Sequence, residues 1–329
     1  MFPDVPEFRF IDSLLKGAAD FKHEPPQKRD WLGVGDDCAL FDGWLVTKDL
    51  SVENTHFRLD WSTPEQAVEK HIVSNVSDIS AMGGKPKLAL LGLCLNRNWS
   101  EETRTRVQQA LSEGFAKRGI ALIGGDTVAG DVGMFSTTLL GELAGEKPLL
   151  RSAVKPGDAL YVNGTLGKSG AGLWLLINHP EAVGDFAALV EYHLNPRISE
   201  SAGAELVRQG ANGAAMDISD GLSSELNHLA TASGVNLQIE ESKLPIDPDV
   251  LRLCDRYHLD PLEFALNGGE EYELLFANSC SKSIFEENEF IGRVCRIGFA
   301  VESSVAPQVC MLRENGEILP VSPRAWSHI

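Results

Sequence analysis

The stretch Gly213-Ala214-Ala215-Met216-Asp217-Ile218-Ser219-Asp220-Gly221-Leu222 passes from a short apolar run into two acidic residues and then into an amphipathic segment. This order predicts a strand over 213–216 and a helix from Ser219 to about Ser233. A carboxylate at the end of a buried strand is costly to desolvate unless it is paired or holds a metal ion. We therefore expect Asp217 and Asp220 to share a cation, with Ser219 capping the helix and leaving free N–H groups for a phosphate. A capped turn without a ligand is the alternative.

Four other short acidic motifs occur along the chain. They are Gly35-Asp36-Asp37, Thr47-Lys48-Asp49, Ser77-Asp78 and Gly124-Gly125-Asp126-Thr127. Each one alone has an ordinary alternative, which is a turn, a strand-end cap or a solvated helix position. Together with the Asp217 motif they indicate a shared cation site, most simply Mg²⁺ bridging phosphates.

Residues 44–50 read as a strand. On it Thr47 and Asp49 share one face, so that a hydroxyl and a carboxylate can ligate one ion, while Lys48 takes the other face. The Lys48 side chain is expected to be solvated or paired to an acid there. An Asp that only caps a turn at the end of the strand is the alternative for Asp49.

The predicted secondary structure around Asp78 and Asp126 also bears on their roles. Residues 64–82 read as a helix, with Asp78 inside it, and Asp is a weak helix former whose presence there needs a reason. His71 on the same helix is expected to be structural or to contact an anionic substrate. The apolar run 120–123 reads as a short strand, so Asp126 follows its C-terminal end, where ligand sites of open α/β sheets gather.

Strand and helix patterns alternate over the whole chain. Its 329 residues, 43% of them hydrophobic, are enough for two cores. We expect two α/β or α+β domains, residues 1–147 and 148–329, with a joint at 147–157. The expected strands are 44–50, 87–95, 120–123, 134–143, 159–163, 213–216, 271–277, 293–301 and 308–313. The expected helices are 8–21, 64–82, 100–118, one after the glycine-rich segment 164–172, and 185–194, 198–210 and 219–233.

The composition excludes several classes of protein. With 47 acidic and 29 basic residues the formal net charge is −18, which argues against a nucleic-acid binder that would need a basic stripe. No apolar stretch approaches the roughly 20 residues of a membrane span, and the N-terminal segment lacks a signal-peptide apolar region. The six cysteines show no close pair with zinc-ligand or redox spacing, so we expect reduced thiols and a cytoplasmic location.

Two glycine-rich segments have open interpretations. Residues 164–170 look like a phosphate loop, but only two residues separate Gly164 from Gly167, so the Walker A spacing is missing. A flexible turn is an equal alternative to a nucleotide contact. Gly268-Gly269-Glu270 precedes an apolar run, and Glu270 can either accept hydrogen bonds from a substrate amine or be a solvated acid in a turn.

Taken in this order, the motifs resemble those of the thiamine-monophosphate kinase family, which shares a superfamily with aminoimidazole-ribonucleotide synthetase. Each motif is weak alone, but their joint order is specific and covers essentially the whole chain. Besides those quoted above, the matching segments are Gly33-Val34-Gly35-Asp36-Asp37-Cys38-Ala39, Asn75-Val76-Ser77-Asp78-Ile79-Ser80-Ala81-Met82-Gly83, Arg151-Ser152 and Lys155-Pro156-Gly157-Asp158.

The resemblance implies ATP-dependent phosphorylation of thiamine monophosphate to thiamine diphosphate. It implies an N-terminal α/β domain whose sheet pairs across a homodimer, and a C-terminal α/β domain. The implied ligands of several Mg²⁺ ions are Asp37, Thr47, Lys48, Asp49, Asp78, Asp126, Asp217 and Asp220. The implied ATP contacts are Gly125, Asp126, Arg151 and Ser219, and the implied contacts with the thiamine substrate are His56, Glu270 and Trp326.

Lys48 departs from the family pattern, which has Thr within a Ser-Thr-Asp triplet. If that Thr binds metal through its backbone carbonyl, Lys48 can replace it, whereas one metal contact is lost if the hydroxyl is needed. Glu271 is a milder departure, because it keeps the charge of the Asp that the family has after Glu270.

The implied reaction needs no general base. The acceptor is itself a phosphate with a second pKa of about 6, so it is largely a dianion near neutral pH. The obstacle is repulsion, since two unit charges about 4 Å apart repel by about 4 kcal/mol at an effective dielectric constant of 20. We expect Mg²⁺ to cancel this repulsion and the transfer to be direct, without a phosphoenzyme.

Other members of the superfamily are disfavoured, with aminoimidazole-ribonucleotide synthetase as the enzyme runner-up. Selenophosphate synthetases have a reactive Cys or selenocysteine near the N-terminus, whereas the first Cys here is Cys38. The hydrogenase-maturation relative has a C-terminal Cys, which this chain lacks, and the Gly-Thr-Lys segment of aminoimidazole-ribonucleotide synthetase is not apparent. A non-catalytic Mg-nucleotide binding module and a two-metal phosphohydrolase are alternatives from other classes.

Overall fold

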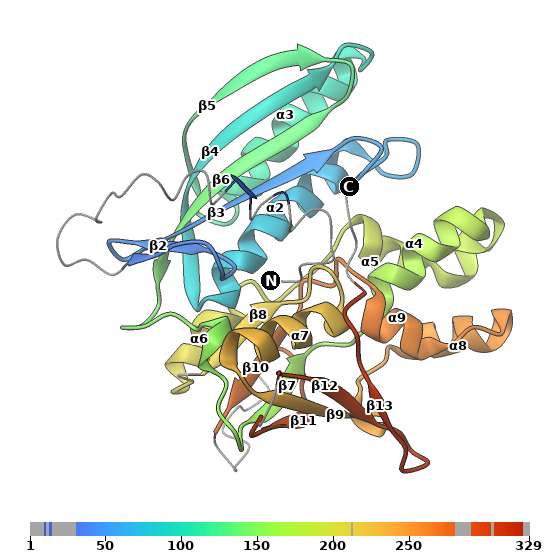
Figure 1. The fold of residues 1–329 in the computed structure, drawn as a ribbon. Coiled ribbons are helices and arrows are strands. Elements are labelled where there is room, and N and C mark those ends of the chain that lie inside the picture. Colours follow the sequence, from blue (N-terminus) through green and yellow to red (C-terminus); the bar gives the residue numbers. More distant parts are fainter. Residues whose placement is uncertain are drawn as a thin grey trace.

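The structure, a computed structural model, describes Phe10, Ser13, Leu14 and residues 31–211, 213–279, 291–303 and 306–324. It contains two β-sheets, the first built from the earlier part of the chain and the second from the later part (Figure 1). Helices pack against both sheets, so the expected two-domain α/β fold is confirmed. Within the described ranges, no helix combines the length and the apolar character that a membrane crossing requires.

The first sheet has six strands in the order β1-β2-β3-β6-β4-β5. Neighbouring strands are antiparallel, except that β4 and β5 are parallel. Strand β5 forms one edge, and nearly all of its residues are exposed. The strands are β1 (Trp31–Leu32), β2 (Ala39–Phe41), β3 (Trp44–Val52), β4 (Gly84–Asn96), β5 (Ala121–Gly130) and β6 (Met134–Leu143).

Helix α2 (Pro64–Ala81) lies between the two sheets. A capping box starts it, because Thr63 accepts a hydrogen bond from the Gln66 N–H and the Gln66 side chain accepts one from the Thr63 N–H. Its apolar stripe, which includes the fully buried Ile72, packs on the first sheet, and burying one such side chain contributes roughly 1.5–3 kcal/mol. Another side of α2 contacts β8 (Ala214–Asp217) of the second sheet.

The second sheet has seven strands in the order β13-β12-β9-β11-β7-β10-β8, and only the β9–β12 pair is parallel. Its strands besides β8 are β7 (Ala159–Asn163), β9 (Asn236–Glu240), β10 (Leu274–Asn278), β11 (Val294–Val301), β12 (Val309–Leu312) and β13 (Ile318–Pro320). The remaining α-helices are α3 (Glu101–Ala116), α4 (Lys168–Asn178), α5 (Ala187–Leu194), α6 (Ala202–Arg208), α7 (Leu222–Ser233), α8 (Pro248–Tyr257) and α9 (Pro261–Asn267). Short 3₁₀ helices cover Arg151–Ala153, Pro180–Phe186 and Glu241–Lys243.

Most of the expected elements are present, and β6 and β7 have the predicted bounds. Strands β1, β2, β9 and β13 and helices α8 and α9 were not predicted. The expected helix 8–21 lies outside the described residues apart from Phe10, Ser13 and Leu14, which are helical. The division at residues 147 and 148 stays a prediction.

Two expectations about the acidic motifs were wrong. Strand β5 does not end at Ile123 but continues to Gly130, because its glycines let it follow the long strand β4. Gly125 has a φ of 155°, and a Cβ there would lie 1.9 Å from the Leu91 carbonyl oxygen. Asp126 is therefore inside an edge strand. Helix α7 begins after Gly221, which is its N-cap, so Ser219 does not cap it.

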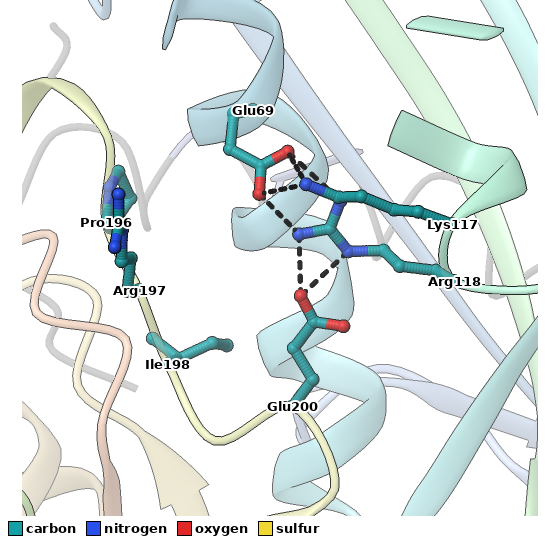
Figure 2. A pocket seen from close by; sticks show the side chains of 7 residues that line it. All are labelled: Glu69, Lys117, Arg118, Pro196, Arg197, Ile198 and Glu200. Carbon is teal, nitrogen blue, oxygen red and sulfur yellow. Dashed lines mark hydrogen bonds and ion pairs between the residues drawn. The ribbon is translucent and has the colours of Figure 1, made fainter. Parts of the chain in front are cut away.

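Arg118 links the first domain to the second. Its guanidinium, with only 4% of the side chain exposed, lies 2.7 Å from Glu69 Oε1 on α2 and 2.6 Å from Glu200 Oε1 in the segment before α6. Figure 2 shows both carboxylates directed at this one guanidinium, with Lys117 beside it. These residues line a polar cavity of about 360 Å³ together with Pro196, Arg197 and Ile198.

An Arg118→Met variant is expected to lose roughly 3 kcal/mol of unfolding free energy, because it leaves two partly buried carboxylates without their shared cation. Lys117→Met is the matched control, since Lys117 contacts the same Glu69 from an exposed position and should cost less than about 1 kcal/mol. Urea unfolding of the two variants measures the difference. Equal losses would show that the buried guanidinium has no special role.

Candidate functional site

Three carboxylates from distant parts of the sequence meet beside helix α2. Asp37 precedes β2, Asp78 lies near the C-terminal end of α2, and Asp217 is the last residue of β8. One carboxylate oxygen of each lies within 4.8 Å of the other two. In the described part of the chain, this is the only group of three or more His, Cys, Asp or Glu side chains close enough to hold a metal ion.

Hydroxyl groups orient two of these carboxylates. Thr47 Oγ1 on β3 donates to Asp78 Oδ2 at 2.5 Å, and Ser77 Oγ on α2 donates to Asp217 Oδ2 at 2.5 Å. Asp49 lies on the same face of β3 as Thr47, and its negative charge acts on Asp78. The predicted face of Thr47 and Asp49 is therefore the face that meets α2.

Arg151 holds the third carboxylate. Its Nη2 lies 2.5 Å from Asp37 Oδ1, and its backbone N–H donates to Asp36 Oδ1 at 2.7 Å. The Asp37 side chain is 1% exposed, and its Oδ2 has no hydrogen-bond partner among the described residues. A buried oxygen without a partner is a ligand position ready for a cation.

The cluster is unfavourable without a cation. Burial raises the pKa of Asp217 to about 8, and the nearby charge of Asp37 adds to the effect. Burial also raises the pKa of Asp78 well above its usual range, and the charges of Asp49 and Asp217 raise it further. Carboxylate oxygens packed this closely fit a hard divalent cation such as Mg²⁺, which would stabilise all of them in the ionised form.

The loop after β8 is held by an internal carboxylate. Glu225 Oε1 on α7 accepts hydrogen bonds from the Ser219 N–H at 3.2 Å and the Asp220 N–H at 2.8 Å. Those N–H groups are therefore not free for a phosphate, which corrects the expectation from the sequence. Burial raises the pKa of the Glu225 carboxyl well above its usual range, and the neighbouring Asp220 adds to this.

Glu270 lies beside this loop. Its backbone N–H donates to the Ser219 carbonyl at 2.7 Å, and a Cβ on the preceding Gly269 would also lie only 2.7 Å from that carbonyl. A residue larger than glycine would therefore push the two segments apart. The Glu270 carboxylate pairs with Lys70 Nζ on α2 at 2.7 Å. The segment that carries Glu270 and the segment that carries Asp217 are thus tied to each other and to α2.

The family models that match the chain are those of AIR synthase related protein, with the N-terminal domain over residues 35–143 and the C-terminal domain over residues 155–303. The thiamine-monophosphate kinase of Mycobacterium tuberculosis is 36% identical over 274 residues, which cover 82% of this chain and 79% of that protein. The thiamine-monophosphate kinase of Bacillus subtilis is 38% identical over 252 residues, covering 74% and 76%. The chain belongs to the thiamine-monophosphate kinase family.

Solved structures of this family agree with that assignment over the full chain. The structure described as AaThiL complexed with AMPPCP and TMP superposes with a TM-score of 0.82 at 32% identity, covering 100% of this chain and 99% of that one. The thiamine monophosphate kinase of Aquifex aeolicus gives a TM-score of 0.77 at 30% identity, covering 95% and 98%.

Not all residues that the family resemblance implied come together. Asp126 and Gly125 lie on β5, and the pairing of Asp126 with Gly92 and of Gly92 with Ser136 puts the Asp126 side chain on the face of the sheet away from α2. The Lys48 side chain is on that face too, where its Nζ donates to Ser136 Oγ at 2.6 Å. The side chains of Asp126 and Lys48 therefore cannot reach the acidic cluster of their own subunit. Of these two residues, only Lys48 can contact a metal ion there, through its backbone.

The two remaining substrate positions have different outcomes. His56 follows β3, where its Nδ1 accepts a hydrogen bond from the Val52 N–H at 3.1 Å and its carbonyl accepts one from Lys70 Nζ at 3.3 Å. Trp326 lies outside the described residues. His71 is a structural residue, since its ring is buried between the hydroxyls of Ser51 and Thr137.

Sequence reasoning missed Ser77, Glu225 and Lys70. Ser77 was visible beside Asp78, but its contact with Asp217 is a long-range one that no local pattern reveals.

The sequence also left two interpretations open for the glycine-rich turn before α4. There the Ser169 N–H donates to Glu271 Oε1 at 3.0 Å, so an internal carboxylate occupies the place that a phosphate would take.

Proposed function

We propose that this protein catalyses the ATP- and Mg²⁺-dependent phosphorylation of thiamine monophosphate to thiamine diphosphate. The observation that carries the proposal is the cluster of Asp37, Asp78 and Asp217 with Arg151 against it. It belongs to a chain that matches over its full length the structure described as complexed with AMPPCP, an ATP analogue, and TMP. A site rich in carboxylates and poor in basic residues suits a metal-dependent transfer between two phosphates.

The roles of individual residues follow the same proposal. Asp37, Asp78 and Asp217 would hold Mg²⁺, with Thr47, Asp49 and the Lys48 backbone on the β3 side, Asp220 on the α7 side, and Asp126 as described below. Arg151, Ser219 and Gly125 would contact ATP, and His56, Glu270 and Trp326 would contact the thiamine substrate. Bound Mg²⁺ would neutralise the phosphate charges and hold the reacting oxygens in line.

The side chains present need not remove a proton from the acceptor. The acceptor phosphate is mostly a dianion near neutral pH, and burial lowers the pKa of His71 to about 3, so this His is neutral and committed to Ser51 and Thr137. Arg151 can stabilise negative charge on a phosphate while it stays paired to Asp37, because a guanidinium has several N–H donors. Direct transfer fits this arrangement.

The proposal is tested by incubating the protein with ATP, Mg²⁺ and thiamine monophosphate and separating the products by chromatography. Thiamine diphosphate should form only when all three are present, with one ADP per product. ATP hydrolysis that is independent of the acceptor would instead indicate a phosphohydrolase.

We also propose that the enzyme is cytoplasmic. Five of the six cysteines lie in the described part and are free thiols there, and free thiols are typical of the reducing cytoplasm.

We further propose that the enzyme is a homodimer formed through β5. This edge strand exposes Leu122, Ile123 and Val128, each more than half accessible, and long apolar edge strands are normally covered. Asp126 faces away from the acidic cluster of its own subunit. In a dimer paired through β5, Asp126 would contribute to the metal site of the partner subunit.

Mixed dimers test this arrangement. Co-expression of Asp126→Asn and Asp217→Asn subunits is expected to restore about a quarter of wild-type activity, because roughly half of the dimers are mixed and one of the two sites in each then carries neither substitution. Each variant alone should remain at least tenfold less active. If the co-expressed sample is no more active than the single variants, Asp126 does not act across the dimer.

A further inference from the structure

Lys70 is a buried cation that no sequence motif pointed to. It lies on α2 with 8% of its side chain exposed, between the first domain and the segment that carries Glu270. A buried lysine is costly to desolvate and is retained only where acceptors surround the ammonium group. Its Nζ lies 2.7 Å from Glu270 Oε2 and 3.3 Å from the His56 carbonyl oxygen.

These two partners belong to the two described residues that are proposed to contact the thiamine substrate. His56 comes from the first domain and Glu270 from the second, so the single ammonium group of Lys70 sets the distance between the two halves of the substrate site. Both contacts recorded for the Glu270 carboxylate, with Lys70 Nζ and with His193 Nδ1 at 3.5 Å, use Oε2. In the described part of the chain Oε1 has no hydrogen bond or ion pair, so this oxygen can accept a hydrogen bond from a ligand.

The backbone around Glu270 is held in an unusual conformation. Glu270 has a φ of 61° and Tyr272 has a φ of 55°. Both lie in the left-handed region, which residues other than Gly rarely adopt. The Tyr272 N–H donates to the Ile218 carbonyl at 2.8 Å, and the Tyr192 hydroxyl donates to the Glu271 carbonyl at 2.8 Å. A segment that is held so firmly against its local preference presents Glu270 in one position.

The charge of Lys70 also matters for the state of Glu270. Burial alone would raise the pKa of the Glu270 carboxyl, but this pKa lies below its usual range, and the largest opposing effect is the charge of Lys70. Burial and the neighbouring Lys70 lower the pKa of His193 to about 3. His193 is therefore neutral near pH 7, and Lys70 is the cation that keeps Glu270 ionised.

From these contacts we infer that Lys70 is a positioning residue that fixes Glu270 and the His56 segment for binding of the thiamine substrate. The inference rests on the proposed function and names a residue that neither the motifs nor the comparisons assign to it. With Lys70 on Oε2, the Glu270 carboxylate presents Oε1 as an ionised acceptor for a ligand with N–H donors, such as the amino group of an aminopyrimidine ring. Lys70 has no hydrogen bond or ion pair with the proposed ATP contacts Gly125, Arg151 and Ser219 in the described part of the chain, so ATP binding should not depend on Lys70.

The test compares Lys70→Met with Lys117→Met, which removes an exposed lysine that pairs with Glu69 away from the site. Lys70→Met is expected to raise KM for thiamine monophosphate at least tenfold, to leave KM for ATP within about twofold, and to weaken direct binding of thiamine monophosphate in calorimetry. Lys117→Met should change none of these. A KM for ATP that rises as much as the KM for thiamine monophosphate would overturn the inference.

A double variant separates positioning from general stability. Because Lys70 acts on Glu270 as well as on the His56 segment, Lys70→Met should raise KM for thiamine monophosphate several-fold less in a Glu270→Gln background than in the wild-type background. An equal rise in both backgrounds would contradict this. Lys70→Gln replaces Lys70→Met if the latter does not fold, with the same outcomes expected. Wild-type protein that makes no thiamine diphosphate would contradict the proposed function. If the wild-type protein is active and the Lys70 variant has an unchanged KM for thiamine monophosphate, only this inference is contradicted.

Discussion

An Asp217→Asn variant is expected to lose at least tenfold in kcat while it gains thermal stability in the absence of Mg²⁺. The gain arises because the pKa of Asp217 is raised by burial, and then by Asp37, to about 8. Near pH 7 this carboxyl therefore disfavours the folded state by roughly 2 kcal/mol or more. Asn removes that cost and can still accept the hydrogen bond from Ser77. The loss of activity arises because an amide cannot neutralise a divalent cation.

These opposite directions distinguish a ligand from a structural residue. Thermal unfolding in EDTA and steady-state kinetics at saturating Mg²⁺ measure both effects on the same protein. Asp185→Asn is a matched control, because the Asp185 carboxylate is exposed and pairs only with Arg256 in the described structure. A destabilised Asp217→Asn protein, or one with unchanged kcat, would contradict the role of Asp217 in metal binding.

The stabilisation by Mg²⁺ is expected to grow as the pH rises. In the metal-free protein, burial raises the pKa of Glu271 to about 8 and that of Glu273 to about 7, as it does for Asp217. Below about pH 4 these carboxyl groups are protonated in both the folded and the unfolded protein, so they do not destabilise the folded state. As the pH rises towards 8 they ionise more readily in the unfolded protein, and the folded state loses stability. Bound Mg²⁺ replaces the proton at Asp217 and removes that part of the loss.

Unfolding temperatures at pH 5 and pH 8, each with Mg²⁺ and with EDTA, measure this effect. The increase caused by Mg²⁺ should be several degrees larger at pH 8 than at pH 5, because ligand binding to the folded state adds directly to stability. Glu271→Gln should lessen the loss at high pH without altering the Mg²⁺ increment, since Glu271 faces the α4 turn. A Mg²⁺ increment that does not vary with pH would show that the acidic cluster does not exchange protons for the metal.

The parts of this site that depend on local pattern could be predicted from the sequence. Alternation along β3 correctly put Thr47 and Asp49 on one face and Lys48 on the other. The helix predicted over residues 64–82 is present as α2, because a helix buried on a sheet repeats its apolar positions. The ordered motifs then led to the family, which the comparisons confirmed.

The parts that depend on tertiary contacts could not be predicted. The apolar run before Asp126 looked like a short buried strand, whereas β4 extends it into an exposed edge strand. The N–H groups of Ser219 and Asp220 were expected to be free, but the Glu225 carboxylate accepts hydrogen bonds from both. Lys70 belongs to none of the sequence motifs, because its partner Glu270 is 200 positions away.

Transfer of label from ATP tests the central claim most directly. With [γ-³²P]ATP, thiamine monophosphate and Mg²⁺, the label should move into thiamine diphosphate, one per ADP formed. No labelled protein should be recovered at any time, because the acceptor phosphate attacks directly in the absence of a protein nucleophile. Label that is released as inorganic phosphate whether or not thiamine monophosphate is present, or a labelled protein that passes its label to the product, would contradict the account.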